Sequence, residues 1–255
     1  MANWSDPQQT SAPYAGRAGT STAARDEGLR SYMLSVYNYM ASGVLLTGVI
    51  ALVFAKSGAV NSLFQITETA RGLAMSPSLL GWAVMLAPLG IVLTMSFGLN
   101  RLSTATLQLL FWSYSALMGL SLSTIFLLYT DMSIAQVFFA TAAGFAGLSL
   151  WGYTTKRDLS GFGTFLIMGL IGIIVASVIN IFLNSGPLSL VISIAGVLVF
   201  AGLTAYDTQK IKGMYDYVAG TDMMGKAVIM GALNLYLDFI NMFLFLLRLF
   251  GSARD

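Results

Sequence analysis

The sequence contains no cysteine and no histidine among its 255 residues. The absence of cysteine excludes disulfides, thiolate metal sites and cysteine nucleophiles. The absence of histidine removes the commonest general base, a common zinc and copper ligand, and the usual switch near neutral pH. A response to pH near neutrality therefore has to come from a carboxyl group in an unusual environment, or from the amino terminus.

Charged residues are also scarce. They make up 9% of the chain, whereas soluble domains carry about 25%. Hydrophobic residues make up 56% of the chain, and the composition therefore predicts a polytopic membrane protein. The net charge of +2 and the absence of a basic run argue against a nucleic-acid partner.

A polar stretch precedes seven apolar segments. Residues 1–28 are rich in Ser, Thr, Ala, Gly and Gln, and we predict that they form a disordered cytoplasmic tail. Residues 29–251 are predicted to form an all-α domain of seven transmembrane helices, because each segment approaches the roughly 20 residues that span a bilayer. The predicted spans are Tyr32–Ala55, Leu79–Phe97, Ala105–Tyr129, Ser133–Tyr153, Phe162–Leu183, Leu188–Asp207 and Val228–Phe250.

The distribution of Lys and Arg predicts the orientation. Nine of the 13 basic residues fall on the side of the amino terminus and four on the other side. Because basic residues concentrate in cytoplasmic loops, the amino terminus is expected in the cytoplasm and the carboxyl terminus outside. The long link between the first two spans then lies outside, and its Asn61–Met75 portion is expected to form an interfacial helix.

The last span carries a carboxylate within an almost wholly apolar run, NLYLDFINMFLFLLRLFG, residues 234–251. Helical spacing places Gly231, Asn234, Asp238 and Asn241 on one narrow stripe. A charged aspartate at the centre of a membrane helix costs roughly 2.5–3.5 kcal/mol on insertion scales. We therefore expect this stripe to face protein or water, either in a functional site or in a purely structural hydrogen bond.

Two further charged residues are expected at a similar depth. Asp207 ends the sixth span in TAYDTQKIK, and Arg101 follows the second span on the same side of the membrane. Two carboxyl groups in contact cannot both ionise cheaply, so Asp207 and Asp238 would share a proton and act as a proton sensor, with Arg101 as a latch. The alternatives are an Asp207 in interfacial water and an Arg101 that only anchors the cytoplasmic side.

The stretches around both aspartates resemble the Bax inhibitor-1 family, also called the transmembrane Bax inhibitor motif family, in its bacterial YccA- and YetJ-like branch. The matching stretches are VFAGLTAYDTQKIKGMY, with Asp207, and NLYLDFINMFLFLLRLFG, with Asp238. In hydropathy and span count the resemblance covers about Leu29–Gly251. It implies a bacterial inner-membrane protein with the C-terminal helix at its centre and six helices wrapped around it.

The resemblance further implies a passive, pH-sensitive calcium leak. Asp207 and Asp238 correspond to the family's hydrogen-bonded aspartate pair, and Arg101 to its second-helix arginine. Calcium takes six to eight oxygen ligands and two carboxylates supply at most four, so these residues are expected to bind calcium weakly and transiently, as permeation requires. Asn234 and Asn241 are the supporting polar residues. The expected partners are the lipid bilayer and calcium or another cation, and no cofactor is expected.

Two other classes of function are alternatives to a leak, an interaction protein and an intramembrane protease. The first is an interaction protein that modulates a membrane protease or a stress response, since the resemblance includes bacterial relatives linked to the protease FtsH. The polar tail is the feature that would serve this role, although a plain disordered extension has the same composition. The second is an intramembrane aspartyl protease, which would carry GxGD, whereas Asp207 follows Ala-Tyr and Asp238 follows Tyr-Leu. We therefore expect that the protein is not an enzyme.

Overall fold

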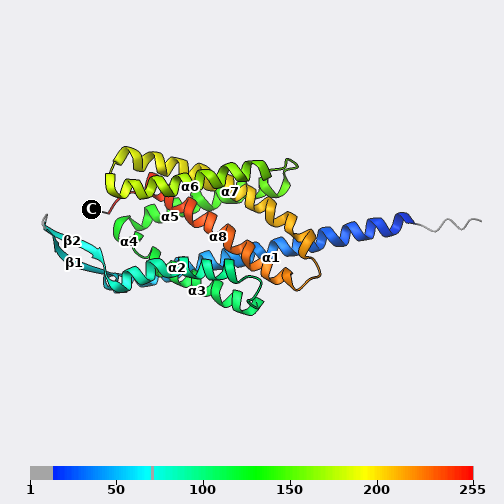
Figure 1. Cartoon of the computed structure of the whole chain (residues 1–255), viewed down its shortest axis with the longest axis horizontal. Helices are drawn as coiled ribbons and strands as arrows, with labels where there is room; N and C mark the ends of the chain where they lie inside the picture. Colours follow the sequence, from blue (N-terminus) through cyan, green and yellow to red (C-terminus); the bar gives the residue numbers. More distant parts are fainter. Residues whose placement is uncertain (1–13, 70–71, 255) are drawn as a thin grey trace, which may run out of the picture.

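The computed structural model describes residues 14–69 and 72–254, and the chain in this part is a bundle of long helices (Figure 1). Seven helices are long and apolar enough to cross a membrane, with α3 and the short α4 forming one of these spans, as the sequence predicts. The protein is therefore an all-α polytopic membrane protein. The helices are α1 (Tyr14–Lys56), α2 (Leu79–Gly98), α3 (Thr104–Leu122), α4 (Ile125–Leu128), α5 (Asp131–Thr154), α6 (Ser160–Leu183), α7 (Gly186–Val218) and α8 (Met223–Phe250).

Hydroxyl side chains fix where several spans begin. The side chains of Ser78, Ser103, Thr130 and Ser185 accept hydrogen bonds from backbone N–H groups in the first turns of α2, α3, α5 and α7. Such caps satisfy N–H groups that have no partner within the helix. The short polar links between apolar segments thus carry the signals that separate one span from the next.

The link between α1 and α2 differs from the prediction. In place of an interfacial helix over Asn61–Met75, the structure has a short 3-10 helix, η1 (Ala59–Leu63), and a two-stranded antiparallel hairpin. Its strands are β1 (Phe64–Thr69) and β2 (Gly72–Pro77), with Phe64 paired to Pro77. The prediction of an interfacial helix was wrong because FQITET alternates apolar and polar residues with a period of two, which favours a strand.

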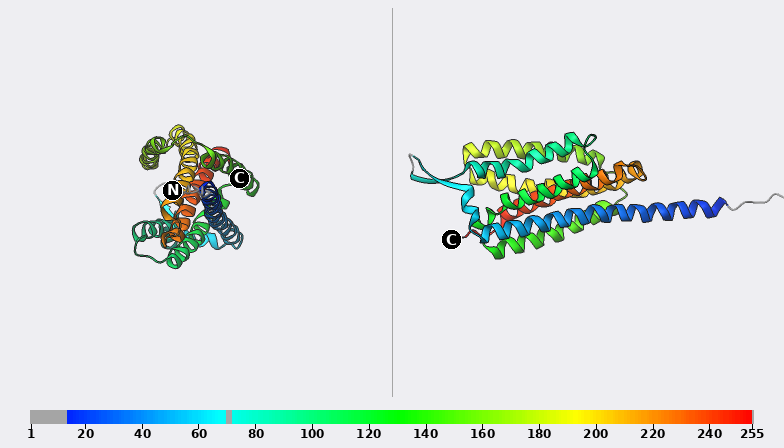
Figure 2. Two further views of the ribbon diagram at one scale, coloured as in Figure 1. Left: turned by 90° about the vertical axis from the view of Figure 1, so that its right-hand side faces the viewer. Right: turned by 90° about the horizontal axis from the view of Figure 1, so that it is seen from below.

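The amino-terminal segment also differs from the prediction. Helix α1 already begins at Tyr14, so residues 14–28 are helical where a disordered tail was expected. Residues 1–13 lie outside the described residues. Figures 1 and 2 show that the first part of α1 projects beyond the end of the bundle, in line with the part of the helix that follows it.

Helix α8 lies at the centre of the bundle. About 67% of its spanning window is buried, more than in any of the other described spans. It packs against α1, α3, α5 and α7, while α2 packs on α3 and α6 on α7 in an outer position (Figure 2). The core therefore consists largely of α8 side chains and the faces of its neighbours, and any polar group on α8 must find a partner inside the bundle.

Tyr236 of α8 illustrates this requirement. Its buried ring packs edge to face with Tyr114, at 5.2 Å between ring centroids, and with Phe111. Thr47 donates a hydrogen bond to the carbonyl of Ser115 (2.8 Å), so its contact with the Tyr236 hydroxyl at 2.7 Å has tyrosine as the donor. One polar group of α1 thus joins α3 to the central helix.

Small residues let α5 and α7 approach closely near the end of the bundle where Asp207 lies. A Cβ atom added at Gly152 of α5 would collide with the backbone of Ala205 in α7. A Cβ atom added at Gly147, one and a half turns earlier on α5, would meet no atom within 4 Å. Only the first glycine is therefore required by packing, as is common where membrane helices cross.

We predict that Gly152→Ala destabilises the bundle by about 1–3 kcal/mol, because backbone atoms on both sides must move apart. Gly147→Ala is the matched control and should leave stability unchanged or slightly raised, since alanine favours helix. Thermal unfolding of both purified variants in detergent measures the difference. Equal midpoints for Gly152→Ala and Gly147→Ala would show that α5 and α7 are not in close contact.

Candidate functional site

The two aspartates predicted to form a pair lie together in the structure. Helix α7 does not stop at Asp207 but continues for about three more turns to Val218. Asp207 therefore lies within the helix and lines the same cavity as Asp238 of α8, with which its carboxyl group interacts electrostatically.

The environment of Asp238 is almost fully closed. The residue is only 4% exposed, and its Oδ2 atom has no hydrogen-bond partner among the residues that the structure describes. Burying a carboxyl oxygen without a partner is costly. Asp238 thus has an oxygen available for a ligand, a proton or water, while Asp207 is only partly buried.

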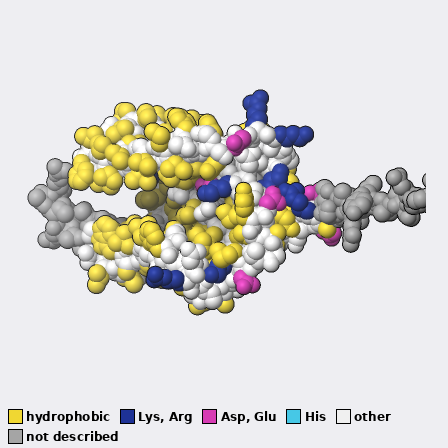
Figure 3. All heavy atoms as spheres, turned by 45° about the vertical axis from the view of Figure 1, so that its right-hand side comes forward, with side chains coloured by type: hydrophobic (Ala, Val, Ile, Leu, Met, Phe, Trp, Pro, Cys, Tyr) yellow, Lys and Arg dark blue, Asp and Glu magenta, His cyan; other side chains and the backbone are white. Residues whose placement is uncertain are grey.

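A cavity of about 620 Å³ lies beside the pair, between α6, α7 and α8. Its polar lining includes both aspartates, Asn234 and Asn241 from α8, and Lys210 from α7. The α6 wall is apolar apart from Ser177, and several of its isoleucines are exposed on the surface of the bundle. Figure 3 shows that one face of the bundle is hollowed between two apolar ridges. Of the predicted stripe of α8, Asn234, Asp238 and Asn241 line the cavity, whereas Gly231 packs against Ile211 of α7.

The two asparagines add oxygen ligands to the carboxylates. The side-chain amide of Asn241 donates its N–H to the carbonyl of Leu237 at 2.8 Å, which leaves its Oδ1 atom free to accept or to bind a cation. With the side-chain oxygen of Asn234, the cavity offers up to four carboxylate and two amide oxygens. Six oxygens is the lower limit of calcium coordination. Nowhere in the described part of the chain do three or more His, Cys, Asp or Glu side chains form a metal-binding cluster.

Arg101 does not lie with the aspartates. It is exposed in the turn between α2 and α3 and does not line the cavity. The basic residue that acts on Asp207 is Lys210, which lies one turn further along α7 and above the ring of Tyr206. The spacing of three residues between Asp207 and Lys210 is visible in the sequence and places the two side chains on neighbouring positions of one helix face.

A chain of hydroxyl groups next to the pair was not predicted. Thr208, which follows Asp207, donates to the carbonyl of Thr204 (2.7 Å), so Ser149 must donate to Thr208 (2.9 Å) and Tyr37 to Ser149 (2.7 Å). This chain connects α1, α5 and α7. In the sequence its only signal is the presence of single hydroxyl residues within apolar spans, and such residues are common.

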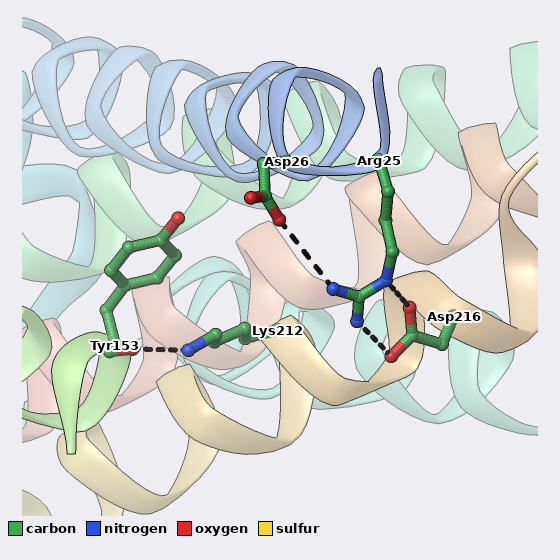
Figure 4. Close-up of polar contacts among 5 residues, drawn as sticks. All are labelled: Arg25, Asp26, Tyr153, Lys212 and Asp216. Carbon is green, nitrogen blue, oxygen red and sulfur yellow. Dashed lines mark hydrogen bonds and ion pairs between the residues drawn. The ribbon is translucent and has the colours of Figure 1, made fainter. Parts of the chain in front are cut away.

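Charged contacts fasten the end of the bundle nearest Asp207. Arg25 of α1 binds both carboxylate oxygens of Asp216 in α7, at 2.9 and 2.7 Å (Figure 4). Lys212 donates to the carbonyl of Tyr153 at 2.7 Å, which joins α7 to α5. In the loop between α5 and α6, at the same end of the bundle, hydrogen bonds from Ser160 lower the pKa of the Asp158 carboxyl. The end of α7 beyond Asp207 is thus held on two sides.

Comparison with known proteins gives a consistent assignment. The family described as inhibitor of apoptosis-promoting Bax1 matches residues 29–255. The chain is 49% identical over 231 residues to the uncharacterized protein RP147 of Rickettsia prowazekii, covering 90% of this chain and 93% of that protein. It is 47% identical over 229 residues to the inner membrane protein YbhL of Escherichia coli K12, covering 89% and 94%. The chain therefore belongs to the Bax inhibitor-1 family of membrane proteins.

Proposed function

We propose that the protein is a passive, pH-sensitive leak for cations, with calcium as the preferred ion. The proposal places it in the bacterial inner membrane, as the name of YbhL states for that relative. The amino terminus would face the cytoplasm, because most basic residues lie at that end. The observation that supports the proposal is the buried Asp207–Asp238 pair, which adjoins a cavity lined by amide oxygens.

Electrostatics explains why such a pair responds to pH. Two ionised carboxylates side by side in a low-dielectric site repel one another strongly, so a state in which the pair holds one proton is favoured over one in which both groups are ionised. A divalent cation compensates the same repulsion. Protons and calcium therefore compete for the same oxygens, and pH sets how strongly the cavity attracts the ion.

The ligand set favours passage of calcium over storage. Six oxygens drawn from four side chains leave water to complete the coordination shell, and both amide oxygens are neutral. Binding of this kind is weak, and permeation requires that an ion leave as readily as it enters. Lys210 adds a positive charge close to Asp207, which further limits how tightly a cation is held.

The arrangement of helices suggests where opening takes place. Helix α2 is attached chiefly to α3, and α6 chiefly to α7, so both lie in outer positions. The face of α8 between α2 and α6 is therefore less covered than its other faces. A change in the charge of the pair alters the contact between Asp207 and Asp238, and that between Asp207 and Lys210. The ion pathway would then open by a shift between two arrangements of the outer helices, with the protonation state setting their populations.

Replacing either aspartate by asparagine is expected to remove the pH response. Asparagine is neutral at every pH and similar in shape to a protonated carboxyl group. Asp207→Asn and Asp238→Asn should therefore hold calcium flux near the value that the wild type shows at acid pH. Fluorescence of an indicator trapped in proteoliposomes measures the flux from acid to mildly alkaline pH.

Asp222→Asn is the matched control, because Asp222 is an exposed aspartate just before the first turn of α8. This variant should keep the wild-type profile. Absence of flux above that of empty liposomes at every pH would overturn the leak. Wild-type pH profiles in both pair variants would overturn the role of the aspartates while leaving the leak itself intact.

The amide oxygens permit a separate prediction. Asn241→Leu removes one proposed ligand and replaces it with an apolar side chain of similar size. The calcium concentration that gives half-maximal flux should then rise by about tenfold, the effect of losing roughly 1.4 kcal/mol of binding energy. Flux measured against calcium concentration gives this value. An unchanged half-maximal concentration would mean that Asn241 does not contact the ion.

A second function is favoured by one observation. The first part of α1 projects from the bundle on the side proposed to be cytoplasmic, where it is accessible to another protein (Figures 1 and 2). We propose as the alternative that this segment binds a membrane protease and modulates it. Such a role would not require ion flux.

Deleting residues 2–22 separates the two functions, since Arg25 and its contact with Asp216 remain. If the segment is the binding element, the deletion abolishes the effect of the protein on the half-life of protease substrates in cells and spares calcium flux. Substrate half-life measured by pulse-chase provides the test. An unchanged effect on substrate half-life would exclude the segment as the binding element.

A further inference from the structure

A groove on the lipid-facing surface between α1 and α5 has no role in the proposed leak. It has a volume of about 500 Å³, within the usual range of ligand sites. The groove exists because α1 packs mainly on α3 and α8, and α5 mainly on α7 and α8, rather than on each other. The hydrogen bond between Tyr37 and Ser149 joins the two helices in the wall of the groove.

The lining of this groove is graded along the membrane normal. Met33 and Leu34 of α1 and Phe145 and Ala146 of α5 form its apolar length. Arg30 and Tyr153 lie at its end toward the polar surface, about two helical turns from Tyr37 and Phe145. Seen from the surface, the groove therefore begins with a cation and continues as an apolar channel.

A polar pocket of about 480 Å³ adjoins this end of the groove, with Tyr153 in the lining of both. The guanidinium of Arg25 in this pocket is already neutralised by two carboxylates, Asp216 and Asp26. Lys212 is different, because it donates to the carbonyl of Tyr153 and has no carboxylate partner in the described part of the chain. Arg30 likewise forms no ion pair with any described residue.

Two cations without carboxylate partners thus lie at the polar end of the groove, Arg30 in its lining and Lys212 in the pocket that adjoins it at Tyr153. We propose that this groove binds one anionic glycerophospholipid, with an acyl chain between α1 and α5 and the phosphate group at Arg30 and Lys212. The charge selects an anionic headgroup, and a guanidinium binds phosphate through two parallel hydrogen bonds. The apolar length of only about two turns suits an acyl chain better than a membrane-spanning helix.

A second groove at the opposite end of the same seam supports this choice by contrast. It lies between Val44–Lys56 of α1 and Asp131–Phe139 of α5 and has a volume of about 440 Å³. Its rim carries one cation, Lys56, and one carboxylate, Asp131, which is paired with Arg254. Because Asp131 is already neutralised by Arg254, Lys56 remains as a single cation at this rim, against two at the first groove. This groove should therefore show a weaker preference for an anionic headgroup.

Native mass spectrometry of the full-length protein in detergent tests the proposal. The probes are phosphatidylglycerol and phosphatidylcholine with identical acyl chains, and inorganic phosphate serves as a headgroup without a chain. The wild type should retain one phosphatidylglycerol in preference to phosphatidylcholine, and inorganic phosphate should not displace it.

Arg30→Gln should weaken phosphatidylglycerol binding by about fivefold, the effect of one basic side chain at an anionic surface, and leave phosphatidylcholine unaffected. Arg157→Gln is its control, since Arg157 lies at the same end of the bundle outside the groove.

Ala146→Leu fills the groove and should abolish retention of the lipid. Ala143→Leu, at an exposed position on α5 outside the groove, should not.

Equal retention of the two lipids, together with equal effects of Arg30→Gln and Arg157→Gln, would overturn the proposal in favour of ordinary solvation by the bilayer. Displacement by inorganic phosphate would also overturn it, because the chain would then contribute nothing. If Ala146→Leu changed the oligomeric mass instead of lipid retention, the groove would be an interface between copies of the chain. None of these outcomes depends on calcium flux.

Discussion

The constraint on which the rest of the structure depends is the carboxyl group of Asp238 inside the most buried of the described spans. A charged or partnerless carboxyl group facing lipid is costly, so α8 has to turn this residue toward other helices. The helix is consequently surrounded on most sides by α1, α3, α5 and α7. Asp207, Asn234 and Asn241 then line the same cavity as Asp238, which α6 closes with a largely apolar wall.

The length of α7 is the second feature that determines where Asp207 lies. Because the helix runs for about three turns beyond Asp207, it carries this residue below the surface and into contact with α8. The same extension carries Lys210, Lys212 and Asp216, and these side chains join α7 to the cavity, to α5 and to α1. The buried pair is thus mechanically connected to the charged contacts at the surface, and movement of one end of α7 would change the other.

The seam between α1 and α5 follows from the same packing. Helix α1 is held by α3 and α8, and α5 by α7 and α8, so α1 and α5 do not need to contact each other along their whole length. The membrane then has to fill what the protein leaves open. Two cations without carboxylate partners lie at one end of the seam and one lies at the other, which makes the two ends chemically different.

The sequence by itself determined the class of the protein and the number and approximate limits of its spans, and it predicted that Asp207 and Asp238 lie close together. These conclusions follow from composition and from the cost of a carboxylate in lipid, neither of which depends on knowing which helices are neighbours. The tertiary structure alone decided that Lys210, rather than Arg101, is the basic residue near the pair, and that Tyr37, Ser149 and Thr208 form a chain. It also decided that a hairpin follows α1. Contacts between distant segments depend on how helices rotate and cross, and one sequence does not specify those angles locally.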